Sequence, residues 1–372
     1  MVLLTILWLL LKSGAATALA QTSPSTKHQT AAESALLMAV ERQPENVGLL
    51  SSLGNAYLQK GKTRESIHWL SKAYALSGGR ESVGYNLAYA HMQVGELETA
   101  KQLIEKMLER SDSALLHNLL GAVEDRRQDH LDATREYHRA AEIEPSEPYI
   151  FDLATFLLQH KQYVGFTDES VKFFRYGVSR FPRSSQMMVG LGVALYDSGQ
   201  YDEAVRVLCT AVDLAPNDRR PVEFLGKVRK VSPALAEQVD QRLRDFAERY
   251  PGNAAANYYY AFSLWQRGGG QEGKNLDKIE GLLRKAEAQA PEWYEPHYQL
   301  GILYGTETRY SAAIREMQKA IKVEPDFSPA HFRLAMFYNR VGDKLNAARE
   351  AAVVKQIKDR QNDSEIMQGA QK

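Results

Sequence analysis

The stretch "LGVALYDSGQYDEAVRVLCTAVDLAP" (Leu191–Pro216) decides the fold, because nearly the same arrangement returns as "LGILYGTETRYSAAIREMQKAIKVEP" (Leu300–Pro325). Both stretches begin with Leu-Gly. Near the end, both have an Ala (Ala211 and Ala320) and a final Pro at matching offsets. An apolar or aromatic residue also follows the Leu-Gly at the same distance in each. This agreement indicates that one structural unit is copied along the chain.

A large residue followed by Gly or Ala marks nine copies of this unit. The pairs are spaced by roughly 33–40 residues, close to the period of about 34 residues that is typical of helical-hairpin arrays. They are Leu53-Gly54, Leu87-Ala88, Leu120-Gly121, Leu153-Ala154, Leu191-Gly192, Leu225-Gly226, Tyr260-Ala261, Leu300-Gly301 and Leu334-Ala335. We number the copies repeats one to nine in this order.

Within each repeat, apolar residues recur at helical spacing in two blocks that a polar turn separates. The turn often contains Gly, as at Gly61, Gly95, Gly199 and Gly342. Pro closes many repeats, where it suits the junction before the next helix. The pattern therefore predicts a helix, a turn and a second helix in each repeat, and an all-α fold.

These residues resemble the tetratricopeptide repeat (TPR) family from about Ala31 to Asp359. Repeat eight carries the pattern best, with Leu300, Gly301, Tyr304, Ala313, Met317, Ala320 and Pro325. The resemblance implies a right-handed superhelical solenoid of stacked helix-turn-helix repeats. It divides the chain into a degenerate half repeat over 31–46, about nine repeats over 47–361 and a disordered tail over 362–372. Polar residues 21–30 are expected to form a disordered leader.

The small residue of each pair has a physical role, since Gly or Ala at a helix crossing lets two backbones approach closely. Three repeats depart from the pattern. Repeat four has extra residues around "HKQYVGFTDE", repeat seven has the glycine-rich insert "RGGGQEGKNLD", and repeat six has Ser232-Pro233 at the expected turn. We expect the insert of repeat seven to be a mobile loop.

Composition excludes several classes of function. The 372 residues carry 46 Lys and Arg against 46 Asp and Glu, so no overall field draws the chain to nucleic acid. The lone Cys209 excludes intramolecular disulfides and Cys-based zinc sites. It follows Leu208 in an apolar helical stripe, which favours a buried small hydrophobe over a nucleophile.

The first twenty residues are typical of a secretory signal peptide. An apolar run from Val2 to Leu11 is followed by small residues and by Ala18-Leu19-Ala20, an A-x-A cleavage pattern. We expect cleavage after Ala20 and a periplasmic or secreted protein. No Lys or Arg precedes the run and Lys12 follows it, so an uncleaved membrane anchor or a cytosolic apolar N-terminus is the alternative.

No constellation of catalytic or metal-ligating residues is evident. The chain has no HExxH or GxSxG motif, and its nine histidines are scattered. The sequence therefore predicts no enzyme activity, no cofactor, no metal and no small-molecule substrate.

The resemblance implies that the first helices line a binding groove. Repeat seven has an aromatic face made by Tyr258, Phe262 and Trp265. Inter-repeat packing is an equal alternative to binding for this face, and packing is favoured for the candidates of the other repeats. Some family members clamp a terminal carboxylate with Asn and basic residues on successive first helices. This chain has Asn55 and Asn118 but lacks the basic residues, so we expect no such clamp. The candidate groove residues are Tyr258, Phe262, Trp265, Tyr298, Ile302, Phe332, Met336, Asn55 and Asn118.

Three functions follow as hypotheses. The first is a non-enzymatic exported scaffold that binds a protein or peptide in this groove. The second is an accessory or regulatory subunit of an enzyme or cell-envelope assembly complex, with catalysis in another chain. The third, an enzyme with an unrecognised site in repeat six or seven, is the least favoured.

Overall fold

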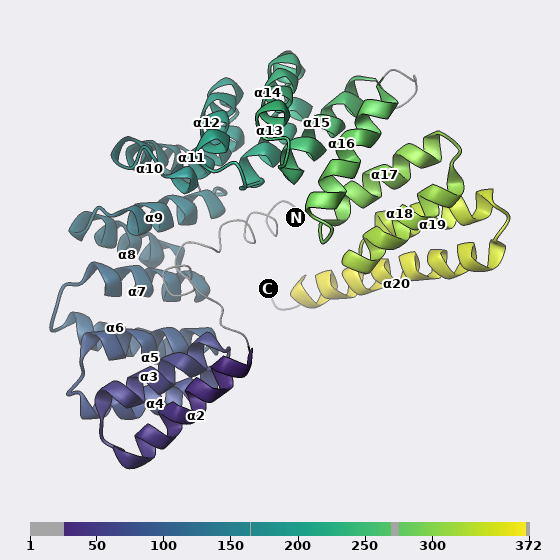
Figure 1. Cartoon of the computed structure of the whole chain (residues 1–372). Helices are drawn as coiled ribbons and strands as arrows, with labels where there is room; N and C mark the ends of the chain where they lie inside the picture. Colours follow the sequence, from purple (N-terminus) through teal and green to yellow (C-terminus); the bar gives the residue numbers. More distant parts are fainter. Residues whose placement is uncertain (1–25, 164, 269–274, 370–372) are drawn as a thin grey trace. The chain divides into compact units, whose positions relative to one another are not determined.

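The computed structural model describes residues 26–163, 165–268 and 275–369 (Figure 1). This part of the chain contains nineteen α-helices, α2 to α20, and one 3-10 helix, η1, without any strand. The expected all-α repeat fold is thereby confirmed. Contacts divide the chain into an N-terminal unit, Met1–Ser198, and a C-terminal unit, Gly199–Lys372.

The N-terminal unit is a stack of helical hairpins in which each helix contacts the next one along the chain. Its helices are α2 (Thr26–Arg42), α3 (Val47–Gln59), α4 (Thr63–Leu76), α5 (Glu81–Gln93), α6 (Leu97–Leu108), α7 (Ala114–Arg126), α8 (His130–Ile143), α9 (Glu147–Gln159), α10 (Phe166–Arg180) and α11 (Ser185–Asp197).

The C-terminal unit continues the same construction. Its helices are α12 (Tyr201–Leu214), α13 (Arg220–Val231), η1 (Pro233–Leu235), α14 (Ala236–Arg249), α15 (Ala254–Arg267), α16 (Leu276–Gln289), α17 (Tyr294–Thr306), α18 (Tyr310–Val323), α19 (Ser328–Arg340) and α20 (Lys344–Gly369). In repeat six, η1 replaces the polar turn because Pro233 cannot continue α13.

Glycine at the helix crossings allows close packing, as the sequence predicts. A Cβ atom on Gly54 would lie 2.6 Å from Leu70 Cγ, and one on Gly301 would lie 2.6 Å from Met317 Cε. Leu70 and Met317 belong to the second helices of these repeats and are fully buried. Gly226 in the irregular repeat six differs, since its nearest neighbour would be Tyr259 Cδ1 at 3.8 Å.

A left-handed residue ends the first helix of several repeats at one fixed position. Gly61 and Gly95 occupy it with φ of 72° and 84°. Gln128 and Thr308 occupy the same position in repeats three and eight with φ of 67° and 60°. A non-glycine residue with positive φ is strained, and a β-branched residue most of all.

A histidine–glutamate pair joins the two helices of several hairpins. His297 Nδ1 lies 3.2 Å from Glu316 Oε2, and the other ring nitrogen lies 3.2 Å from the carbonyl oxygen of Pro291. Since that carbonyl oxygen can only accept, Nε2 donates to it. The same pairing recurs between His117 and Glu136 and between His331 and Glu350.

Helix bounds differ from the sequence expectation at both ends of the repeats. Helix α2 begins at Thr26, inside the stretch expected to be a disordered leader, and α20 continues to Gly369, beyond residue 361. Proline and glycine interrupt helices. The first stretch has no proline after Pro24, and the second has no glycine before Gly369, so both can be helical. The predicted signal peptide, 1–20, and the insert glycines Gly269 and Gly270 lie outside the described residues.

Among the described residues, no helix combines the length and the apolar character needed to cross a membrane.

Candidate functional site

An aromatic surface in the C-terminal unit joins the first helices of repeats seven and eight. The rings of Tyr258 and Phe262 on α15 are nearly parallel, at an interplanar angle of 13° and a centroid distance of 6.1 Å. The Tyr258 ring also lies 4.7 Å from Trp293, and the Tyr298 ring on α17 lies 5.0 Å from Phe327. We call these five residues the aromatic surface, although Trp293 itself is buried beneath it.

Local structure places the aromatic side chains of α15 on one face of the helix. Asn253 caps the helix, since its side chain accepts a hydrogen bond from the Ala256 amide. Tyr258 and Phe262 are one helical turn apart and therefore share a face. Both are half-buried, so they contribute to packing between repeats and also retain surface for a partner.

Charged groups surround the aromatic surface. Burial raises the pKa of the Glu295 carboxyl group, whereas a hydrogen bond from its own backbone amide and the charge of Arg219 oppose the shift, and the charge of Glu223 adds to it. Arg219 lies over the Trp293 ring at 5.3 Å. Glu295 Oε2 is buried and accepts no hydrogen bond from the described residues. This carboxylate oxygen thus lacks a donor among the described residues, although it is itself shielded from solvent.

Burial also raises the pKa of the Tyr258 hydroxyl group, with Glu295 and Glu223 adding to the effect. The hydroxyl therefore stays protonated and neutral near neutral pH. This hydroxyl and the Glu295 carboxyl group are thus largely buried polar groups next to the stacked rings. An apolar, aromatic lining with a few fixed polar groups is the usual composition of a ligand-binding pocket.

The remaining candidates of this unit lie on the same first helices. Trp265 on α15 and Ile302 on α17 are half-buried. Phe332 and Met336 on α19 are more open, with 55% and 37% of their surface exposed. These two exposed apolar side chains are one turn apart and lie on the face that the sequence assigned to binding.

Asn55 on α3 and Asn118 on α7 are half-buried in the N-terminal unit. Asn118 Nδ2 donates to Asp152 Oδ2 at 2.9 Å, and burial raises the pKa of Asp152 to about 6. The Oδ1 atoms of both asparagines are buried and accept no hydrogen bond from the described residues. Tyr85, whose pKa burial raises to about 12, interacts electrostatically with Asp152.

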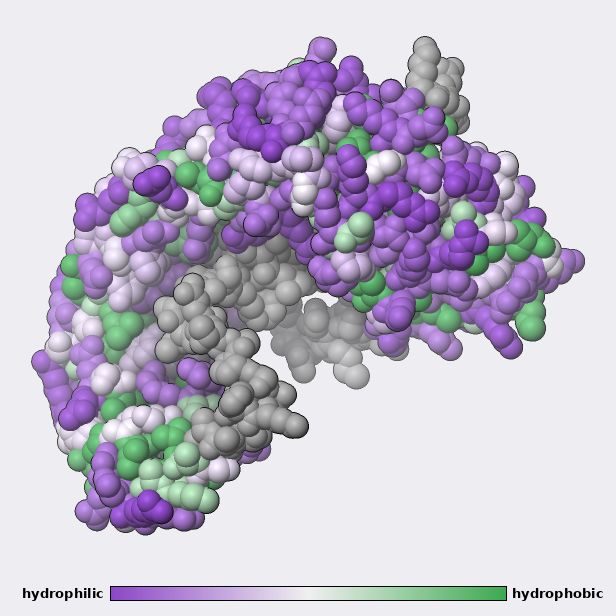
Figure 2. Space-filling model, viewed as in Figure 1, coloured by the Kyte–Doolittle hydropathy of each residue, from purple (hydrophilic) through white to green (hydrophobic). Residues whose placement is uncertain are grey.

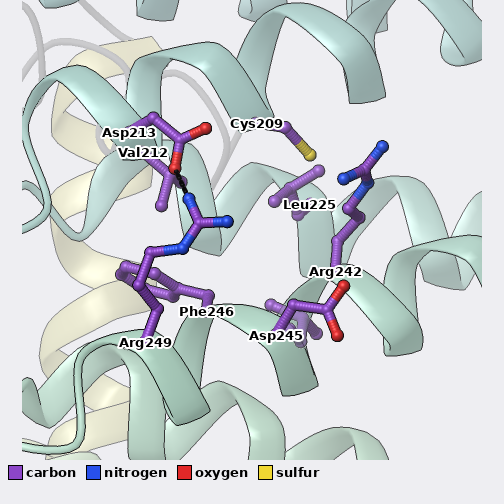
Figure 3. A pocket seen from close by; sticks show the side chains of 9 residues that line it. Cys209, Val212, Asp213, Leu225, Arg242, Asp245, Phe246 and Arg249 are labelled. Atoms are coloured by element: carbon purple, nitrogen blue, oxygen red, sulfur yellow. Dashed lines mark hydrogen bonds and ion pairs between the residues drawn. The ribbon is translucent and has the colours of Figure 1, made fainter.

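Cys209 lines a small pocket between α12, α13 and α14 (Figure 3). Its volume of about 40 Å³ has room for little more than water. Burial raises the pKa of the thiol to about 11, although Arg242 on the opposite wall lowers it. The thiolate is therefore scarce near neutral pH, which agrees with the prediction of a non-nucleophilic cysteine. Cys209 is half-buried, however, and not fully buried as the sequence predicted.

Sequence reasoning missed several residues that the fold brings together. The sequence analysis did not predict four residues at or near the aromatic surface, because the family pattern assigns only three positions of each first helix to the groove. They are Glu223, Glu295, Trp293 and Phe327. A cluster of Asp125, His130 and His160 was also missed. Residues about one repeat apart lie next to each other in such arrays. Asp125 and His160 are separated by about one repeat, and this spacing could have indicated that they are neighbours.

Hydrophilic residues make up most of the visible face of the molecule, with hydrophobic residues in small patches (Figure 2). The stacked hairpins define a helical-repeat protein whose candidate sites lie on first helices. Residues 158–219 and 294–327 both match models of the tetratricopeptide repeat. The chain belongs to the tetratricopeptide repeat family.

The human protein O-mannosyl-transferase TMTC1 is similar to part of the chain. It is 22% identical over 191 residues, which are 51% of this chain and 22% of that protein. The match therefore spans about a fifth of the length of this curated relative.

Two solved structures are also similar in fold. Yeast Tom70 is 13% identical, with 96% of each chain covered and a TM-score of 0.47. YrrB, described as a TPR protein with an unusual peptide-binding site, is 19% identical, with 51% of this chain and 96% of that chain covered and a TM-score of 0.38.

Proposed function

We propose that the chain is a non-enzymatic, exported scaffold that binds a protein or peptide through the first helices of its repeats. The observation that carries this proposal is the aromatic surface next to the unpaired Glu295 Oε2. Preformed repeats bind with little ordering of their own, because stacking already fixes the helices.

In this proposal, the C-terminal unit recognises an extended segment that carries an apolar or aromatic side chain and a hydrogen-bond donor. Phe332 and Met336 contact the apolar group, since they are the most exposed candidates on these helices. Tyr258 and Phe262 provide a rigid aromatic anchor at low cost in side-chain entropy. Glu295 accepts from a backbone amide or a basic side chain of the partner.

The N-terminal unit, taken by itself, offers a second and polar candidate for binding in this proposal. The Oδ1 atoms of Asn55 and Asn118 are buried acceptors without a hydrogen bond from the described residues. Such acceptors are costly unless a ligand or water pairs with them. In this proposal, a bound partner or water satisfies these acceptors within the N-terminal unit.

A random peptide library displayed on phage, selected against the full chain, tests this function. We expect enriched peptides whose affinity falls at least tenfold in the double variant Phe332→Ala/Met336→Ala. Tyr176→Ala is the matched control, because Tyr176 is 45% exposed on the second helix α10. Equal losses in both variants, or no enriched sequence at all, would contradict the proposal.

We propose export on the basis of residues 1–20. The apolar run and the A-x-A pattern before Gln21 support cleavage after Ala20. N-terminal sequencing of the chain purified from its natural source tests this. A mature chain starting at Gln21 is expected, and a chain that still begins at Met1 would contradict cleavage.

A second candidate is an accessory subunit of an enzyme or cell-envelope assembly complex. The similarity to 191 residues of a human protein named as an O-mannosyl-transferase favours it, since it places related repeats in a longer protein named as an enzyme. Size-exclusion chromatography of the native complex distinguishes the two. An enzymatic chain at fixed stoichiometry supports an accessory subunit, whereas exchangeable peptide partners support the scaffold.

A further inference from the structure

Three side chains with ligand atoms converge at one end of repeats three and four. Asp125 is near the end of α7, His130 is the first residue of α8, and His160 follows α9 directly. His160 Nε2 lies 2.8 Å from Asp125 Oδ1, and His130 Nδ1 lies 3.3 Å from the same oxygen. The two imidazole rings are 4.1 Å apart between centroids.

Two of the three ligand-atom separations are close to those around a tetrahedral metal ion, and all three ligand atoms lie within 4.8 Å of one another. Zinc binds imidazole nitrogen at about 2.0–2.1 Å and carboxylate oxygen at about 2.0–2.2 Å, so tetrahedral ligand atoms are about 3.3 Å apart. One measured separation equals this value and the other is 0.5 Å shorter. A small outward movement of the His160 ring would therefore admit the ion.

Hydrogen bonding leaves a ligand atom of the cluster available. His130 Nδ1 is buried and makes no hydrogen bond with the described residues, although a ring nitrogen of this kind is normally paired. A metal ion would satisfy this nitrogen, because a neutral imidazole offers its lone pair as a ligand.

Nearby cations are engaged elsewhere, so they do not neutralise Asp125. Arg127 pairs with Glu98 at 2.8 Å, and Lys161 pairs with Asp197 at 2.8 Å. The other histidine–carboxylate cluster of the described residues differs in this respect. There Lys319 lies 2.6 Å from Glu287 and 3.2 Å from Glu316, so its charge competes with a metal ion.

We propose that Asp125, His130 and His160 bind a divalent transition-metal ion, with Zn²⁺ as the best fit. Two imidazoles and one carboxylate suit this class of metal. Three protein ligands leave one coordination position for water. A shallow pocket lined by His130, Leu131, Tyr163 and Phe166 adjoins the site. The ion joins α7, α8 and the end of α9, and so ties repeat three to repeat four.

Equilibrium dialysis of the full chain against ZnCl₂ tests the site. We expect one high-affinity equivalent of zinc in the parent chain and at least a tenfold weaker Kd in His160→Ala. His68→Ala is the matched control, because His68 is an exposed histidine outside the cluster, and it is expected to retain the parent affinity. Circular dichroism confirms that each variant is folded.

Cobalt substitution gives a second readout. Co²⁺ in a four-coordinate site has intense visible absorption, which we expect in the parent chain and not in Asp125→Asn. If His160→Ala does not fold, the nearly isosteric variant Asp125→Asn takes its place in the zinc-binding measurement. Zinc binding that is absent from the parent chain, or that is equally strong in Asp125→Asn and His160→Ala, would overturn the proposal.

Discussion

Changing Gly54 to Ala tests the packing argument, because the structure offers a matched control in Gly226. Both glycines follow a Leu at the same position of their repeats, and both lie within a helix. Alanine favours a helix over glycine by about 1 kcal/mol at either site. The difference between the two variants therefore isolates the contact that the new methyl group makes.

The methyl group on residue 54 meets Leu70 Cγ at 2.6 Å and the Leu70 amide nitrogen at 3.3 Å. Leu70 is fully buried, so it has little room to move, and overpacking of this kind costs about 1–3 kcal/mol. At position 226 the nearest atom is 3.8 Å away, which is an ordinary van der Waals contact. Gly54→Ala is thus expected to be about 1–3 kcal/mol less stable than Gly226→Ala.

Urea denaturation followed by circular dichroism measures both variants against the parent chain. We expect the urea concentration at the midpoint of unfolding to be lower for Gly54→Ala than for the parent chain. If unfolding has two transitions, the first midpoint is the lower one. For Gly226→Ala we expect an unchanged or higher midpoint. Equal shifts in the two variants would refute the argument that small residues at the crossings are required by close helix contact.

Three further predictions concern a strained turn, a buried ion pair and the thiol. Thr308→Gly should stabilise the chain by about 1 kcal/mol in urea denaturation, because glycine tolerates positive φ, whereas Gly342→Thr should destabilise it. Burial opposes protonation of His297, but its hydrogen bonds to Glu316 and to the Pro291 carbonyl raise its pKa above 6.5, while the pKa of Glu316 is lowered below 4.5. The histidine's contribution to stability is therefore complete below pH 6.5 and is lost as pH rises through its folded pKa. The contribution of Glu316 is present above pH 4.5 and is lost on acidification. A His297→Gln variant whose midpoint changes between pH 6 and pH 9 as much as the parent's would contradict this. Finally, Cys209 should react with a thiol reagent at pH 8 far more slowly than in urea, since partial burial raises its pKa to about 11, and equal rates would count against this effect of burial.

The fold was predictable because the same residue types recur at the same positions of each repeat. Contacts between repeats were harder to predict. Leu-Gly pairs and turn glycines located the hairpins because each has a local geometric cause. Gln128 and Thr308 broke the glycine pattern, yet the chain keeps the same backbone geometry there because the hairpin on either side enforces it.

The candidate site was predictable only in part. Periodicity placed Tyr258 and Phe262 on one face of α15, but it could not show that the Trp293 ring, at the start of the next repeat, lies 4.7 Å from the Tyr258 ring. Likewise, no linear motif joins Asp125 to His160. Their proximity arises from the stacking of neighbouring hairpins, and the repeat period relates the two positions only once that stacking is known.

Hydrogen–deuterium exchange of the full chain, with and without a peptide selected from the library, tests the binding face most directly. The account predicts that the peptide slows exchange in the first helices α15, α17 and α19. Protection confined to the second helices α16 and α18, or no change in any of these helices at saturating peptide, would contradict it.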